Sequence, residues 1–373
     1  MSMTIRENTL AILRHESYER LPLVHFGFWI ETLQKWCAEG HFSETLLEDV
    51  YDGSDNESEI ARLLGFDFNW FGCLKNNPDL SPCFERVVEK QLSDGTLHVR
   101  DRNGVTVLEK PGLVSISSEI DHLLTDRDSW EEHYKWRLQY SEERVSLAQL
   151  EALKNEKDRP LPLGLHCGSL FGLMRDIMGL EGVSYLYCDD EKLYDEIIET
   201  FGALCYKIVE RTLETGVKFD YAHFWEDICY KNGPLVTPQV FADKVGPQYK
   251  KITDLLHRHG VDIISVDCDG WIDSLIPTWL ENGVNTMFPI EVGTWEASFA
   301  PWHKEFGQKI KGVGGMNKSV FSLDFAAIDK EIERLVPLIQ MGGYIPCPDH
   351  RIAPDAKWEN VRYYCEKLRE SVK

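Results

Sequence analysis

Short apolar runs alternate with longer segments of helical periodicity along the chain. Eight of these runs have the length of buried β-strands, and several are bounded by glycine or proline. They lie at residues 21–27, 66–71, 161–167, 219–225, 262–268, 284–290, 310–315 and 343–347. Helices are predicted between them, among others at residues 190–215, 238–259, 272–282, 325–341 and 357–372.

Residues 238–259 show the helical pattern clearly. Thr237 is suited to be the N-cap, apolar side chains recur at helical spacing, and Gly260 ends the pattern. Alternation of strands and helices predicts parallel strands joined by right-handed crossovers. Eight strand–helix units therefore predict an α/β fold, a (β/α)₈ TIM barrel that residues 1–373 form as a single domain.

One stretch departs from this alternation. Residues 84–112 hold β-like segments with turn signals at Asp94-Gly95 and Asn103-Gly104. We interpret this stretch as a β-hairpin insertion that covers the mouth of the barrel and not as a separate domain.

Charge and composition narrow the class of partner. Asp and Glu total 62 against 40 Lys and Arg, and the net charge of −22 opposes binding to nucleic acids and to anionic membranes. No run approaches the roughly 18 apolar residues of a membrane helix. None of the ten cysteines forms a Cys-x-x-Cys pair, so free thiols in a cytoplasmic protein are expected. The expected partner is a small molecule or another protein.

Five predicted strands end in residues that carry chemistry, and TIM barrels build their active sites at these ends. Carboxylates that are buried together need a compensating cation, yet Lys and Arg are scarce nearby. The pattern therefore predicts a divalent metal ion, and zinc accepts aspartate, histidine and cysteine as ligands. The strand-end residues are His166 and Cys167, His223 and Glu226, Asp267 to Asp269, Glu291, and Cys347 to His350.

Each of these groups also has a purely structural interpretation. Asp267 or Asp269 would serve as a helix cap, and Cys167 as a small buried apolar residue. His350 would be a loop histidine, and Glu226 would pair with a nearby lysine. The metal interpretation is favoured because the barrel brings the strand ends together.

Aromatic residues are dense at the same predicted rim. Tryptophan just beyond a strand end is less easily explained by core packing than by a ligand pocket. We therefore predict that a flat or apolar substrate contacts Trp29, Trp70, Trp225 and Trp271, together with Glu291.

Several stretches resemble the uroporphyrinogen decarboxylase superfamily, which is built on a (β/α)₈ barrel. The resemblance covers most of the chain. Its closing pattern is a strand-end histidine, a proline, and a Glu-Asn pair that opens a helix. The stretches are residues 168–182, 226–241, 267–291 and 342–364, and the pattern consists of His350, Pro354 and Glu359-Asn360.

Two activities are known in this superfamily. Its decarboxylases carry an Arg-Gln-Ala-Gly-Arg motif near the first strand, which binds substrate carboxylates. Residues 22–33, PLVHFGFWIETL, contain no arginine. The resemblance therefore implies the other branch, the zinc-dependent methyltransferases that work with a corrinoid (cobalamin) carried by a partner protein.

The zinc motif of that branch resembles His-x-Cys-Gly with a later cysteine. Alignment on Gly270 places Asp267 and Asp269 on the first two ligands, and the closing pattern places His350 on the third. Cys268 and Cys347 are the alternatives in a shifted register. Carboxylate and imidazole ligands leave zinc a harder Lewis acid, which suits an oxygen leaving group. This departure implies an O-demethylase with an O-methylated, methoxyaromatic donor.

The leading hypothesis is therefore methyl transfer to a corrinoid protein, in which Glu226 or His166 orients the substrate or protonates the leaving alkoxide. A decarboxylase that acts on a smaller substrate is the second hypothesis. The third is a non-catalytic binding protein on the same fold, because a fold alone does not determine function.

Overall fold

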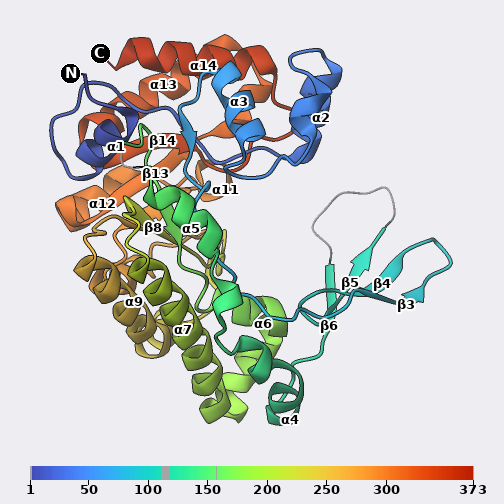
Figure 1. Cartoon of the computed structure of the whole chain (residues 1–373). Coiled ribbons are helices and arrows are strands. Elements are labelled where there is room, and N and C mark those ends of the chain that lie inside the picture. The colour runs from blue at the N-terminus through green and yellow to red at the C-terminus, as the bar shows by residue number, and fades with distance from the viewer. Residues whose placement is uncertain (1, 111–117, 157, 373) are drawn as a thin grey trace.

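The computed structural model describes residues 2–110, 118–156 and 158–372, and a parallel sheet of six strands lies at its centre (Figure 1). Neighbours in the sheet follow one another in chain order, and every pair is parallel. The strands are β7 (Gly164–His166), β8 (Tyr221–Trp225), β11 (Ile264–Asp267), β12 (Thr286–Phe288), β13 (Lys311–Met316) and β14 (Tyr344–Pro348).

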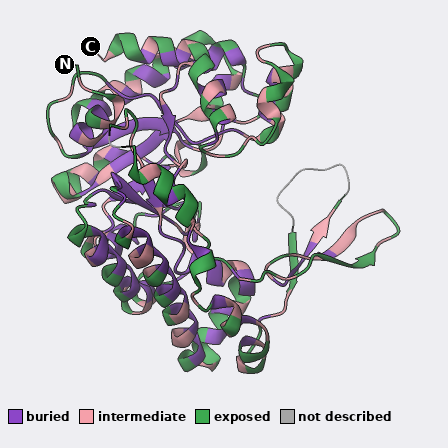
Figure 2. Ribbon diagram, viewed as in Figure 1, coloured by how far each residue is buried: buried purple, intermediate pink, exposed green. Residues whose placement is uncertain are grey.

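These strands are buried on both faces. All residues of β11, β12 and β14 are buried, as expected for parallel strands that helices cover from outside. Figure 2 shows the central strands in the colour of buried residues and the outer sides of the helices largely exposed. The continuous apolar runs in the sequence are therefore core strands.

Two further parallel strands, β1 (Val24–His25) and β2 (Phe68–Asn69), pair with each other. Beyond β2, the Leu74 amide donates to the Gly164 carbonyl of β7 at 2.9 Å. Beyond β1, the Trp29 amide donates to the carbonyl of Ile352, just after β14, at 3.2 Å. All eight predicted strands thus correspond to parallel strands of an α/β fold.

Helices connect the strands. The predicted helix at residues 238–259 begins at Thr237, whose hydroxyl accepts from the Val240 amide at 3.4 Å, and contains a π-helical turn at 241–245. The helices are α1 (Ile5–Leu13), α2 (Ile30–Ala38), α3 (Asp55–Leu64), α4 (Arg127–Ser129), α5 (Leu147–Lys154), α6 (Gly172–Asp189), α7 (Glu191–Glu214), α8 (Pro238–Val240), α9 (Gly246–Arg258), α10 (Ile276–Glu281), α11 (Val292–Trp295), α12 (Phe299–Phe306), α13 (Phe325–Gln340) and α14 (Trp358–Ser371).

A separate antiparallel sheet extends away from this body (Figure 1). It has its own small apolar cluster of Val99, Val105 and Val107. The stretch predicted as a hairpin at 84–112 supplies its first three strands, and residues 111 and 112 lie outside the described part. The strands, in sheet order, are β3 (Val87–Gln91), β4 (Leu97–Arg100), β5 (Val105–Glu109) and β6 (Ser118–His122).

Among the described residues, no helix combines the length and the apolar character needed to cross a membrane.

Candidate functional site

Acidic residues and one histidine meet where β8, β11, β12 and β14 end. Asp269 Oδ2 lies 3.4 Å from His350 Nε2, and the Gly270 amide donates to Glu291 Oε2 at 2.6 Å. Asp267 is buried at the end of β11. The structure thus brings together Asp267, Asp269, Glu291 and His350 from three different strand ends.

This acidic cluster, which also includes Asp227, is electrostatically crowded. Burial first, and then the charges of Asp269 and Asp227, raise the pKa of Asp267 well above its usual value. Burial and the charge of Asp269 also raise the pKa of Glu291 and that of Asp227. The cluster is therefore a place where additional negative charge is costly and a proton or a cation is favoured.

Arg351 is the cation that partly balances the cluster. Its charge lowers the pKa of Asp267, and its two terminal nitrogens lie 2.9 and 2.6 Å from the oxygens of Asp52. The backbone of Gly27 lies against this pair, since a Cβ there would be 2.6 Å from Asp52 and 2.7 Å from Arg351. Asp52 lies in a loop before α3, where no strand-end pattern in the sequence marks it.

Replacement of Arg351 by Met is expected to lower the free energy of unfolding by roughly 1–3 kcal/mol. The reason is that Asp52, whose side chain is 14% exposed, loses its bidentate partner. Urea unfolding measures the change. The control is Arg362→Met, which removes an exposed helix pair with Glu366 worth roughly 0.3–0.5 kcal/mol. Equal losses of stability in the two variants would show that the Asp52–Arg351 pair stabilises the protein no more than an exposed ion pair does.

Glu226 was predicted to act on the substrate, but its carboxylate is fully buried and turned toward the start of α6. It accepts hydrogen bonds from the amides of Leu170, Phe171 and Gly172 at 2.9, 2.9 and 2.7 Å, and from the Ser169 and Tyr249 hydroxyls. Burial raises its pKa, while these bonds oppose the rise. This geometry favours a structural role, in which Glu226 holds the segment after β7 in place.

The predicted tryptophans divide into two groups. Trp70 is fully buried and stacks on Tyr221 at 4.1 Å between ring centroids, so it packs in the core. Trp29 stacks on His350 at 5.8 Å, and the 44% exposed Trp271 stacks on Trp295 at 6.0 Å. Trp29 therefore lies directly against the acidic cluster, whereas Trp70 does not reach it.

His166 and Trp225 line a cavity of about 300 Å³ beside the ends of β7 and β8. Burial and the nearby charge of Lys75 lower the pKa of His166 to about 3, so its imidazole is neutral at physiological pH. The Gly168 amide donates to His166 Nδ1 at 3.2 Å, which leaves the proton on Nε2. His166 is therefore a hydrogen-bond donor and not an acid.

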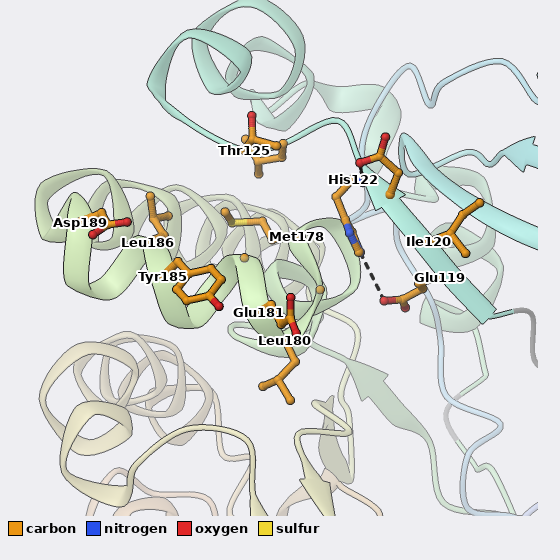
Figure 3. Close-up of a pocket in the computed structure, with 14 residues that line it drawn as sticks. Glu119, Ile120, His122, Thr125, Met178, Leu180, Glu181, Tyr185, Leu186 and Asp189 are labelled. Carbon is orange, nitrogen blue, oxygen red and sulfur yellow. Dashed lines mark hydrogen bonds and ion pairs between the residues drawn. The ribbon is translucent and has the colours of Figure 1, made fainter.

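A larger cavity, of about 520 Å³, separates β6 from α6 (Figure 3). His122 lies 3.3 Å from Glu119 and packs on Gly179, where a φ of 67° breaks α6. A Cβ at that position would lie 2.6 Å from the His122 ring. The antiparallel sheet thus contacts the body at the break in α6, and none of the predicted site residues lines this cavity.

The residues predicted to bind zinc do not form a ready site. Within residues 2–110, 118–156 and 158–372, no three His, Cys, Asp or Glu side chains are grouped so as to hold a metal ion. Burial raises the pKa of the Cys268 and Cys347 thiols, which disfavours the thiolate that binds metals. Asp269 Oδ1 and His350 Nδ1 are nevertheless buried without a hydrogen-bond partner in the described structure, so each keeps an unused hydrogen-bonding or metal-binding capacity.

Solved structures show what this chain is similar to. A methyltransferase from Methanosarcina mazei has a TM-score of 0.60 at 13% identity, with 99% of each chain covered, and supports the fold. A B12-independent methionine synthase from Shewanella sp. W3-18-1 has a TM-score of 0.48 at 12% identity, with 94% of this chain and 98% of the other covered. No curated protein is similar enough in sequence to count as a match. Residues 120–371, more than half of the chain, match uroporphyrinogen decarboxylase (URO-D), and the chain therefore belongs to the uroporphyrinogen decarboxylase family.

Proposed function

We propose that this chain is a methyltransferase that moves a methyl group from an O-methylated, methoxyaromatic donor to a corrinoid protein. The observation that carries the proposal is the crowding of Asp227, Asp267, Asp269 and Glu291 around His350. A polycarboxylate such as a porphyrinogen would meet like charges there, which costs several kcal/mol. Residues 22–33 also lack the arginines that would bind it. An ether carries no charge at the reacting carbon and avoids this repulsion.

The partner's corrinoid supplies the nucleophile that accepts the methyl group. When the carbon–oxygen bond of the donor breaks, its electron pair stays on the oxygen, which must take up a proton. His350 is suited to deliver this proton from Nδ1, which has no partner in the described structure. Asp269, at 3.4 Å from Nε2, stabilises the protonated imidazole before transfer. The products on the donor side are then a free phenol or alcohol.

We further infer that the eight parallel strands close into a TIM barrel. Support comes from backbone hydrogen bonds that join the β1–β2 pair to β7 on one side and to the segment after β14 on the other. The amide of His166 in β7 donates to the Leu74 carbonyl at 2.9 Å, and that of Ile352 donates to the Gly27 carbonyl at 3.1 Å. In a closed barrel the acidic cluster would lie at the mouth, where a second protein can present its corrinoid.

The function is tested with the purified chain, para-methoxyphenol and free cobalamin reduced to its cobalt(I) form. We expect the absorption spectrum to change to that of the methylated corrinoid, at a rate that depends on enzyme and donor. Uroporphyrinogen in a parallel reaction should release no carbon dioxide. Carbon dioxide release without a corrinoid, combined with no methylation, would instead support a decarboxylase.

Zinc is a separate proposal and an alternative to the proton-donor role of His350, because an imidazole nitrogen that binds zinc carries no proton. The unpaired Asp269 and His350 atoms and the crowded carboxylates are features that a cation would relieve, although a third ligand would have to move toward them. We expect about one zinc ion per chain and at least a 10–100-fold weaker affinity in His350→Ala. Elemental analysis with circular dichroism measures metal and fold together. Equal zinc in the variant would remove His350 as a ligand, and a fully active metal-free protein would end the zinc proposal.

A further inference from the structure

The cavity of about 520 Å³ between β6 and α6 has the features of a surface that binds another protein (Figure 3). Its floor is apolar, because Leu124, Met178 and Leu186 line it and are buried. Two large apolar side chains of the same lining are exposed, Ile120 at 43% and Tyr185 at 64%. Apolar side chains that gather around one hollow, instead of lying singly on the surface, mark a site of interaction.

Four carboxylates line the same cavity. Glu119 and Asp121 belong to β6, and Glu181 and Asp189 belong to α6. Among the described residues of the lining there is no lysine or arginine. The imidazole of His122 lies 3.3 Å from Glu119, so it is already engaged with one of the four. The cavity therefore carries negative charge beside its apolar surface.

Two arginines flank the lining segments in the sequence, and neither neutralises the cavity. Arg127 lies 2.8 Å from Glu196, and Arg175 lies 3.0 Å from Asp176. Both of these carboxylates are outside the lining. The charge of the cavity is thus left for a cationic partner, which electrostatic complementarity favours.

The acidic and aromatic side chains of α6 form a row. The helix breaks at Gly179, which has φ 67° and ψ 167°, and helical geometry resumes after it. In this second part Glu181, Tyr185 and Asp189 recur every four residues, so they share one face of the helix. A rise of about 1.5 Å per residue places the two acids roughly 12 Å apart, with the exposed tyrosine between them.

An extended peptide can match this row. Every second side chain of a β-strand lies on the same face, and a rise of about 3.3 Å per residue separates positions i and i+4 by roughly 13 Å. A basic-x-apolar-x-basic segment therefore presents two cations at the spacing of Glu181 and Asp189. Its apolar side chain then meets Tyr185. In the described part of the antiparallel sheet, β6 is an outer strand, an edge of the kind that extended segments bind.

A second copy of this chain is a poor occupant of the cavity. Each copy carries a net charge of −22, so two copies repel each other. Two β6 strands that met edge to edge would also bring Glu119 and Asp121 of one copy against those of the other. Charged side chains on an outer strand oppose such pairing between copies. The charge thus favours a different, basic partner.

We infer that this cavity is a docking site for a basic extended segment of a partner protein. Two basic side chains of the segment pair with Glu181 and Asp189, and an apolar side chain between them packs on Tyr185 and the apolar floor. The inference goes beyond the proposed methyl transfer, because none of the residues of the acidic cluster lines this cavity. It also gives the antiparallel sheet a role, since β6 forms one wall.

The test is fluorescence anisotropy of a labelled, capped peptide with Arg-Ser-Leu-Ser-Arg at its centre, titrated with the full chain. Tyr185→Ala should weaken binding roughly tenfold or more, as for a central aromatic contact. Glu181→Gln should weaken it roughly two- to fivefold. The matched controls are Tyr51→Ala, a tyrosine that is 68% exposed, and Glu333→Gln on α13. Both should bind the peptide as the unchanged protein does, and circular dichroism verifies the fold of each variant.

Two altered peptides separate the apolar contact from the charge. Serine in place of the leucine, and glutamine in place of both arginines, should each remove most of the binding. Equal binding of the leucine and serine peptides, or equal losses in the control variants, would mean that overall negative charge attracts the peptide, and either result overturns the docking site. No binding of the first peptide overturns it as well.

Sedimentation velocity tests the alternative occupant. We expect the protein to sediment as the same species with and without the Tyr185→Ala substitution. A dimer that this substitution dissociates would assign the cavity to a second copy of the chain and overturn the partner segment. None of these measurements involves methyl transfer, so their outcome is independent of the proposed function.

Discussion

Replacement of Glu226 by alanine is expected to lower the free energy of unfolding by about 3–5 kcal/mol. Three backbone amides at the start of α6 and the hydroxyls of Ser169 and Tyr249 all donate to this one carboxylate. Without it, these donors remain buried with no acceptor, and each unmet donor costs roughly 1–3 kcal/mol. Urea unfolding monitored by circular dichroism measures the loss.

Two further variants test whether the loss of stability is specific to the buried Glu226 carboxylate. Glu226→Gln keeps one acceptor oxygen and should lose less stability than the alanine variant. Glu333→Ala removes an exposed carboxylate of α13 and is expected to change stability by no more than roughly 0.5 kcal/mol. Hydrogen exchange at residues 170–175 should accelerate in the Glu226 variants only. A stability change in Glu226→Ala as small as in Glu333→Ala would show that the buried network contributes little.

His350→Ala is expected to slow methyl transfer by roughly 10²–10⁴-fold, the range for loss of a positioned proton donor. Asp269→Asn should slow it as well, because the amide cannot stabilise a protonated imidazole at 3.4 Å. The rate is measured as corrinoid methylation at saturating donor. Donor affinity should change less than rate, because a proton donor acts mainly on the transition state, where charge develops on the leaving oxygen.

His259→Ala provides the control for this prediction, because His259 is exposed between α9 and the start of β11, whereas the acidic cluster lies at the end of that strand. The double variant of Asp269 and His350 should be no slower than His350→Ala, as expected for two residues that act as one unit. Full activity of His350→Ala would exclude the imidazole from proton transfer, and additive losses would mean that the two residues act separately.

The sequence predicted the parallel strands well for a physical reason. Strands such as β11 and β14 are covered on both faces, so they appear as uninterrupted apolar runs that stand out from their amphipathic neighbours. The helix at residues 238–259 was predicted equally well, because a capping threonine, Thr237, and a terminal glycine, Gly260, mark its two ends. The antiparallel sheet was predicted only in part, since its fourth strand, β6, carries mostly exposed residues and no apolar alternation.

The neighbourhood of Asp269 and His350 also followed from the sequence, because parallel strands place their C-terminal ends at one edge of a sheet. The roles of single side chains did not follow from the sequence. Glu226 and Asp269 both follow strand ends, yet the first is held by buried donors and the second faces His350. Which way a side chain turns depends on the donors that the packed chain presents to it.

The sequence by itself therefore determined the strand order and the set of chemical groups at one edge of the sheet, because both depend on local pattern and chain direction. Only the tertiary structure decided how the charges are balanced. Arg351 pairs with Asp52, 299 residues away in the chain, and Arg102 of the antiparallel sheet lines the same cavity as His166 at the end of β7. Such pairings depend on distances between segments remote in sequence, and no local pattern encodes them.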